Sequence, residues 1–182
     1  QPGAANEVDD TVMTYTVPPV PVGFFAVDPA VTPNGDLTYT VAADVNGSAT
    51  FDIQVQDSGD GMDTSDIQTF TVTVGAVNDP PTFTANALAP VQEDAPQQDI
   101  VGWAINFDPG PVDEGGQMIV EYVVSNVQAG FFAATPTVAV NGDLSFTPAA
   151  NAFGSGTFDV QVRDSGGEDD GGGDLSPART VT

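Results

Sequence analysis

The 182-residue sequence contains no cysteine, no histidine and no lysine, and its only basic residues are two arginines. Without thiols or imidazoles it cannot build a disulfide framework, a Cys or Ser-His-Asp nucleophile system, or a zinc or haem site with sulfur or nitrogen ligands. The scarcity of cations also excludes nucleic acid and anionic membrane surfaces as partners, because nothing would neutralise their phosphates. A metal ion could therefore be bound only through oxygen ligands.

Acidic side chains dominate the charge, with 26 Asp and Glu residues and a formal net charge of −24. Glu occurs only five times and Asp 21 times. The short carboxylate suits loops that wrap a hard cation such as calcium, whereas a solubilising surface usually mixes Glu with Lys. Hydrophobic residues make up 40% of the chain and are arranged periodically, which favours a folded core over disorder.

No apolar run is long enough to span a membrane, so direct membrane insertion is not expected. Gln1 follows no apolar stretch. If the protein is exported, its signal therefore lies outside this sequence.

The chain repeats itself at an offset of 107 residues. Residues 23–59 and 130–166 share 23 of 37 aligned positions. The repeat predicts two domains, at residues 1–79 and 80–182. The stretch from residue 80 to roughly residue 109 has no counterpart in copy one, because nearly all of it would precede Gln1, and the counterpart of residues 72–79 would follow Thr182. We therefore expect copy one to lack its first two strands, and the last strand of copy two to be cut short.

Both copies show short segments in which apolar and polar residues alternate, as in residues 50–56 and 157–163. Asn-Gly dipeptides at residues 34–35 and 141–142 indicate tight turns before further strands. The pattern predicts an all-β sandwich with about seven strands per copy. The segments expected to be strands in copy two are residues 82–93, 100–105, 118–125, 131–140, 144–147, 157–163 and 177–182.

Several motifs carry a family resemblance. They are VNDPPTF at residues 77–83, VQEDAP at 91–96, GWAINFDPGPVDEGGQ at 102–117, and the two DSG loops. Together they resemble the cadherin-like repeats of large bacterial surface adhesins and RTX-type repeat proteins. The resemblance implies tandem Ig-like or cadherin-like Greek-key β-sandwiches, with calcium ions held at each junction by both neighbouring domains.

Matched to that pattern, eight residues are implied as calcium ligands, and Asn106 stands where the family has an aspartate. They are Asn78, Asp79, Asn106, Asp108, Asp164, Asp57, Asp44 and Glu93. Calcium takes about six to eight oxygens in irregular geometry, so loops of two domains can share an ion. Without a cation the carboxylates would repel one another. The expected affinity is that of extracellular modules, with Kd about 10⁻⁴ to 10⁻³ M.

A second acidic cluster lies in the loop of residues 57–66, which contains Asp60 and Asp63, and in its longer twin at residues 164–174. Neither loop fits the EF-hand spacing or the glycine-rich nonapeptide repeat. Glycine would let backbone carbonyls and carboxylates face one ion. A calcium loop and an ordinary hairpin tip both remain open for Asp60 and Asp63.

The carboxylate pairs recur in both copies at loop ends without an aromatic cleft, so we expect no enzymatic activity. The first functional hypothesis is a calcium-rigidified extracellular segment of a surface adhesin or filament, giving length and stiffness for cell adhesion. The alternatives are a carbohydrate-binding accessory module and a subunit that polymerises by strand addition. The expected partners are neighbouring repeats, other copies of the protein, or cell-surface glycans.

Overall fold

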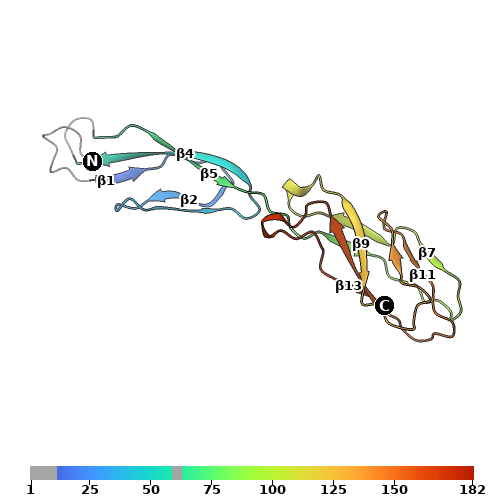
Figure 1. The fold of residues 1–182 in the computed structure, drawn as a ribbon. Helices are drawn as coiled ribbons and strands as arrows, with labels where there is room; N and C mark the ends of the chain where they lie inside the picture. The colour runs from blue at the N-terminus through green and yellow to red at the C-terminus, as the bar shows by residue number, and fades with distance from the viewer. Residues whose placement is uncertain (1–11, 59–62) are drawn as a thin grey trace. The chain divides into compact units, whose positions relative to one another are not determined.

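The computed structural model describes residues 12–58 and 63–182, and it is built from β-strands with two short 3₁₀ helices (Figure 1). The chain divides into two compact units, Gln1–Ala76 and Val77–Thr182, called unit 1 and unit 2 below. The predicted all-β fold is confirmed. None of the helices in the described part of the chain has the length and hydropathy needed to cross a lipid bilayer.

Unit 1 contains two small antiparallel sheets within the described residues. One has the order β1-β4-β5 and the other pairs β2 with β3. The strands are β1 (Val12–Thr16), β2 (Phe25–Val31), β3 (Leu37–Val41), β4 (Gly47–Asp57) and β5 (Gln68–Val74). Phe25, Ala49 and Phe51 form its buried core, and the Phe25 and Phe51 rings meet edge to face at 6.1 Å between centroids.

Unit 2, whose residues are all described, is built from three antiparallel sheets. Their orders are β13-β12-β9, β10-β11-β7 and β6-β8. The first four strands are β6 (Thr82–Ala85), β7 (Gln98–Ile100), β8 (Ala104–Asp108) and β9 (Ile119–Ser125), with the helix η1 (Val112–Glu114) between β8 and β9. The others are β10 (Thr137–Val138), β11 (Leu144–Phe146), β12 (Phe158–Asp164) and β13 (Arg179–Val181), with the helix η2 (Asp169–Gly171) before β13.

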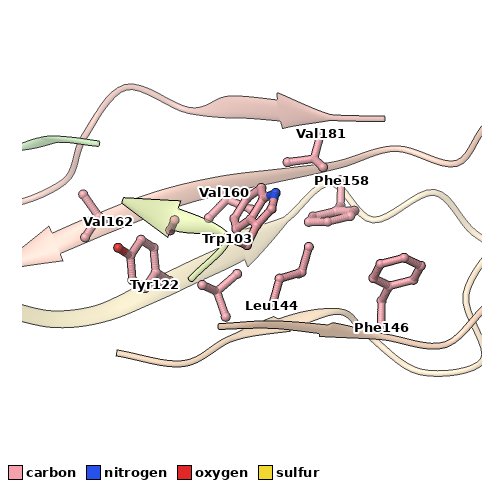
Figure 2. Close-up of a cluster of buried hydrophobic side chains, with 10 residues drawn as sticks. Trp103, Tyr122, Leu144, Phe146, Phe158, Val160, Val162 and Val181 are labelled. Atoms are coloured by element: carbon pink, nitrogen blue, oxygen red, sulfur yellow. The ribbon is translucent and has the colours of Figure 1, made fainter. Parts of the chain in front are cut away.

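The core of unit 2 surrounds Trp103, which is 1% exposed. Figure 2 shows its ring in the middle of the cluster, with Val160 beside it and Leu144 nearby from the opposite sheet. Strand β12 alternates buried and half-buried residues along its whole length, with Phe158, Val160 and Val162 pointing inward. This period of two is the pattern that the sequence predicted for a half-buried strand.

Three predicted strands of unit 2 differ in the structure. The segment expected at residues 100–105 is interrupted by a turn at Val101 and Gly102, and Gly102 has φ +60°. The strand expected at residues 82–93 ends at Ala85, and only Thr137–Val138 remains of the strand expected at residues 131–140. Pro90 and Pro136 lie within these two shortened segments, and the nitrogen of proline cannot donate a hydrogen bond to a neighbouring strand.

The repeat is also visible in the hydrogen bonds. At the offset of 107, β1 to β4 match β9 to β12, and β5 matches β13 after the four-residue insertion of the second acidic loop. Ser65 bonds the backbone of Val55 through its own nitrogen at 2.9 Å and its hydroxyl at 3.0 Å. Ser176 bonds Val162 in the same two ways, at 2.9 Å each. In both units, therefore, the serine that follows the acidic loop is bonded in the same way to the strand that precedes the loop.

Candidate functional site

Asn78, the second residue of unit 2, is the hub of a polar cluster at the end of β12. Its amide nitrogen lies 3.2 Å from Asp164 Oδ1, 3.1 Å from the carbonyl oxygen of Gly167 and 2.8 Å from that of Gly173. Its Oδ1 accepts a hydrogen bond of 2.7 Å from Gln117 Nε2. A side-chain amide has only two hydrogens, so three oxygens converge on a donor that cannot serve all of them fully.

Glycines in the loop after β12 make room for Asn78. A Cβ atom at Gly166 would lie 1.8 Å from Asn78 Oδ1, and one at Gly172 would lie 2.9 Å from the Asn78 backbone nitrogen and oxygen. The Gly173 nitrogen donates to the Asn78 carbonyl at 2.9 Å. Glycine at residues 166 and 172 is therefore required for close packing around Asn78.

Three carboxylates in this region are buried. Glu114, Asp164 and Asp174 are 5%, 2% and 8% exposed. Glu114 Oε1 accepts a 2.8 Å hydrogen bond from the backbone nitrogen of Asp79, so η1 is tied to the start of unit 2. Four buried oxygens have no hydrogen-bond partner, and they are Glu114 Oε2, Gln117 Oε1, Asp164 Oδ2 and Asp174 Oδ1. Unpaired buried oxygens carry a desolvation cost that a bound cation would offset.

Arg163 compensates part of this negative charge. Its guanidinium pairs with Asp174, and its Nε lies 3.1 Å from Glu121 Oε1. The hydrogen bond to Asp174 is the largest cause of a raised pKa for Arg163, despite the opposing effect of partial burial. Asp164 and Glu114 have no such ion pair among the described residues. The negative charge beside Asn78 is thus left without a protein cation.

Replacing Asn78 with alanine is expected to lower the free energy of unfolding of unit 2 by about 1–3 kcal/mol, because the Gly167 and Gly173 carbonyls lose a half-buried donor. Urea unfolding in EDTA, followed by the fluorescence of Trp103, measures this loss. Asn106→Ala is the matched control, since the exposed Asn106 side chain makes one 2.9 Å bond to Thr84, and its effect should stay within about 0.5 kcal/mol. Equal effects of the two substitutions would contradict a hub role for Asn78.

The other ligands implied near the start of unit 2 are placed differently. Asp79 and Asp108 are exposed, and Asp108 Oδ1 accepts a 3.3 Å hydrogen bond from the Gly110 nitrogen. Asn106 has a left-handed backbone, with φ +53°, and its amide bonds Thr84. Among the implied ligands, the Asn78 side chain is hydrogen-bonded to the Asp164 carboxylate. Asp79 contributes its backbone nitrogen, which donates to Glu114.

Of the remaining candidate ligands, Asp44, Asp57 and Asp63 belong to unit 1, and Glu93 belongs to unit 2. Asp44 is exposed with φ +55°, and Glu93 is exposed in the segment between β6 and β7. Asp57 and Asp63 are linked by a 2.9 Å bond from the Asp57 nitrogen to the Asp63 carbonyl. Gln56 Nε2 donates to Asp63 Oδ2 at 2.7 Å and is the largest cause of the lowered pKa of Asp63. Asp60 lies outside the described residues.

The sequence did not single out Glu114, Gln117 or Asp174 as site residues. Glu114 and Gln117 lie in the motif VDEGGQ, which contributed to the family resemblance, but nothing in the pattern marked them as buried. Across the part of the chain that the structure describes, no three His, Cys, Asp or Glu residues are grouped so that they could hold a metal ion. The oxygens around Asn78 are a mixture of carboxylates, a side-chain amide and backbone carbonyls, which is a donor set of the kind that calcium accepts.

A second feature is a hollow of about 760 Å³ in unit 2, lined by Phe131, Phe146, Phe153 and the segment before β7. In unit 1 the second half of β5 covers the equivalent backbone, where Val72 pairs with Ala49 and Val74 with Gly47. Strand β13 pairs with β12 only from Phe158 onward. The hollow therefore coincides with the position of a paired strand in the other copy and is not evidence of a ligand site.

The comparison with protein families gives a match over unit 2. The profile of the bacterial Ig domain matches residues 78–172, just over half of the chain. The chain belongs to the bacterial Ig-domain family. This finding agrees with the predicted Ig-like fold, and it does not extend to the narrower cadherin-like assignment. Bacterial Ig domains are common in surface proteins and are typically structural modules without enzymatic activity. Neither the curated proteins nor the solved structures include a match to this chain.

Proposed function

We propose that this bacterial Ig-domain chain is a calcium-binding, cadherin-like segment of an extracellular surface adhesin or filament, and that it contributes length and stiffness for cell adhesion. The observation that supports the proposal is the convergence of three oxygens on the Asn78 amide nitrogen. Four further buried oxygens in the same region have no hydrogen-bond partner. Calcium is the hard cation that takes six to eight such oxygens in irregular geometry.

The position of the cluster in the chain connects calcium binding to stiffness. Asn78 follows the boundary between the units, after Ala76, by two residues, and Pro80 and Pro81 come directly after Asp79. A cation held by Asn78, Glu114 and Asp164 would restrain the start of unit 2 at the connecting peptide. Each ion would also remove two units of negative charge from a chain that has only two cations.

Calcium is expected to stabilise unit 2 by about 1–2 kcal/mol at about 5 mM, given a Kd in the range of about 10⁻⁴ to 10⁻³ M. Trp103 is the only tryptophan of the chain and lies in unit 2, so its fluorescence reports the unfolding of that unit alone. Urea unfolding is compared in EDTA, in calcium and in magnesium. Small-angle X-ray scattering under the same conditions should show a narrower range of interdomain distances in calcium only.

Two substitutions on one strand separate site binding from general charge screening. Asp164→Asn removes the buried carboxylate beside Asn78 and should abolish the calcium-dependent stabilisation. Asp159→Asn makes the same charge change on β12, where Asp159 accepts a 2.6 Å bond from Thr180, and should retain it. An equal response of wild type and both variants, or an equal response to magnesium, would contradict a specific calcium site.

A further inference from the structure

Arg163 of unit 2 and Gln56 of unit 1 occupy the same position of the repeat and bind the same partner with different charges. Gln56 Nε2 donates to Asp63 Oδ2 at 2.7 Å, and the Arg163 guanidinium pairs with Asp174. The offset of 107 matches Gln56 to Arg163, and with the four added residues of the second acidic loop it matches Asp63 to Asp174. A neutral amide is therefore enough to tie this aspartate to the strand.

The backbone of the two loops is held in the same way as well. The Asp57 nitrogen bonds the Asp63 carbonyl at 2.9 Å, and the Asp164 nitrogen bonds the Asp174 carbonyl at 3.0 Å. The geometry of the loop thus does not require the positive charge of Arg163. That charge is nevertheless one of only two in a chain with 26 acidic residues.

The charge of Arg163 is held close to the Asn78 cluster. Arg163 precedes Asp164 at the end of β12, and Asp164 Oδ2 is buried without a hydrogen-bond partner. The guanidinium pairs with one oxygen of Asp174, and the other oxygen of Asp174 is also buried and unpaired. Asp174 follows Gly173, whose carbonyl accepts a hydrogen bond from Asn78. The guanidinium therefore contacts a carboxylate that borders the proposed cation site.

Glu121 offsets this positive charge only in part. The Glu121 side chain is 55% exposed, whereas that of Asp174 is 11% exposed. Water and salt screen an exposed ion pair more strongly than a buried one. The charge of Arg163 therefore acts mainly on Asp174 and its buried surroundings.

We propose that Arg163 is an internal counter-cation that competes with calcium for the carboxylates of unit 2. In the absence of metal, the guanidinium offsets part of the negative charge that Asp164 and Asp174 bring into the folded unit. When calcium binds, the same positive charge repels the ion and weakens its binding. The inference rests on the proposed calcium site, and it adds that Arg163 lowers the affinity of that site while stabilising unit 2 when the site is empty.

Arg163→Gln tests this role in the full 182-residue chain, because it removes the charge and introduces the side chain that makes the equivalent hydrogen bond in unit 1. The calcium dependence of the urea midpoint, followed by Trp103 fluorescence, gives the Kd of each variant by linkage. We expect Arg163→Gln to bind calcium at least about threefold more tightly than the wild type. In EDTA its urea midpoint should fall, because Asp174 loses its counter-cation.

Two matched variants and a change of salt separate the local charge from other effects. Arg179→Gln removes the other basic residue of unit 2, which lies on β13 opposite Val160, and should leave the Kd within about twofold of the wild type. Arg163→Lys keeps the charge and should also retain the wild-type Kd. Potassium chloride at about 0.5 M should reduce the difference between the wild type and Arg163→Gln, because salt screens the repulsion.

The outcomes distinguish failure of this inference from failure of the proposed function. If the wild type binds calcium and Arg163→Gln has an unchanged or weaker affinity, the counter-cation role is overturned and the calcium site stands. An equal gain in affinity for Arg179→Gln also overturns that role, because the effect would then come from net charge. If the wild type shows no calcium dependence, the proposed function fails and the inference fails with it.

Discussion

Replacement of Trp103 by alanine is expected to lower the free energy of unfolding of unit 2 by about 3–5 kcal/mol. The indole is 1% exposed and lies at the centre of the core cluster, between β12 and β11 (Figure 2). An aromatic side chain of this size buries about 150–250 Å² of surface, and its removal also leaves a cavity that the surrounding strands fill only in part. The loss should therefore exceed that from any other single side chain of the segment between β6 and β8.

Because the substitution removes the fluorescence probe, the measurement is hydrogen exchange of the β12 backbone amides in increasing urea. Phe153→Ala is the control, since Phe153 is 85% exposed and its truncation should change the stability by less than about 0.5 kcal/mol. The β4 amides of unit 1, whose core is a separate cluster, provide an internal reference. A loss below about 1 kcal/mol for Trp103→Ala would show that the tryptophan does not organise the core of unit 2.

The alternation of residues along the strands was sufficient to predict the fold class. Phe158, Val160 and Val162 alternate with polar residues, and the structure buries these three positions. The strand expected at residues 100–105 was interrupted because Gly102 adopts a positive φ, and the Val101–Gly102 turn divides it into β7 and β8. Local apolar character alone does not locate such a turn, because a continuous apolar run is compatible with an unbroken strand.

The candidate site was predictable only in part. Asn78 and Asp164 were implied by the family resemblance, and the structure joins them by a hydrogen bond across 86 residues of sequence. Nothing in the local sequence marked Glu114 or Gln117 as buried, whereas the structure buries the Glu114 carboxylate against the Asp79 backbone. Burial of this kind depends on the packing of distant segments, which no local pattern encodes.

Replacing the glycine of the Asn-Gly turn with alanine is expected to destabilise unit 2 more than unit 1. Gly35 and Gly142 are the glycines of the two Asn-Gly turns, with φ +91° and +86°. Each turn has the same hydrogen bond, from Gly35 to the Thr32 carbonyl at 2.9 Å and from Gly142 to the Ala139 carbonyl at 2.8 Å. Alanine at either position therefore carries the same backbone cost of about 1 kcal/mol for a left-handed conformation.

The surroundings of the two glycines differ, because only unit 2 has β8 packed on the turn. A Cβ atom at Gly142 would lie 2.2 Å from the Ala104 carbonyl oxygen, whereas one at Gly35 meets only the Tyr15 hydroxyl at 3.6 Å. Gly142→Ala must shift the backbone of β8 and weaken its 2.9 Å hydrogen bond from the Ala104 nitrogen to the Gly142 carbonyl. Overpacking of this kind adds about 1–3 kcal/mol, so the total loss in unit 2 is expected to be about 2–4 kcal/mol.

Urea unfolding followed by Trp103 fluorescence measures the Gly142→Ala variant, and hydrogen exchange of the β2 and β3 amides measures Gly35→Ala in unit 1. Gly35→Ala should cost about 1 kcal/mol in unit 1 and leave the Trp103 transition unchanged. Equal losses in the two units would mean that β8 does not press on the Gly142 turn. A larger loss for Gly142→Ala would instead show that β8 constrains the Asn-Gly turn of unit 2.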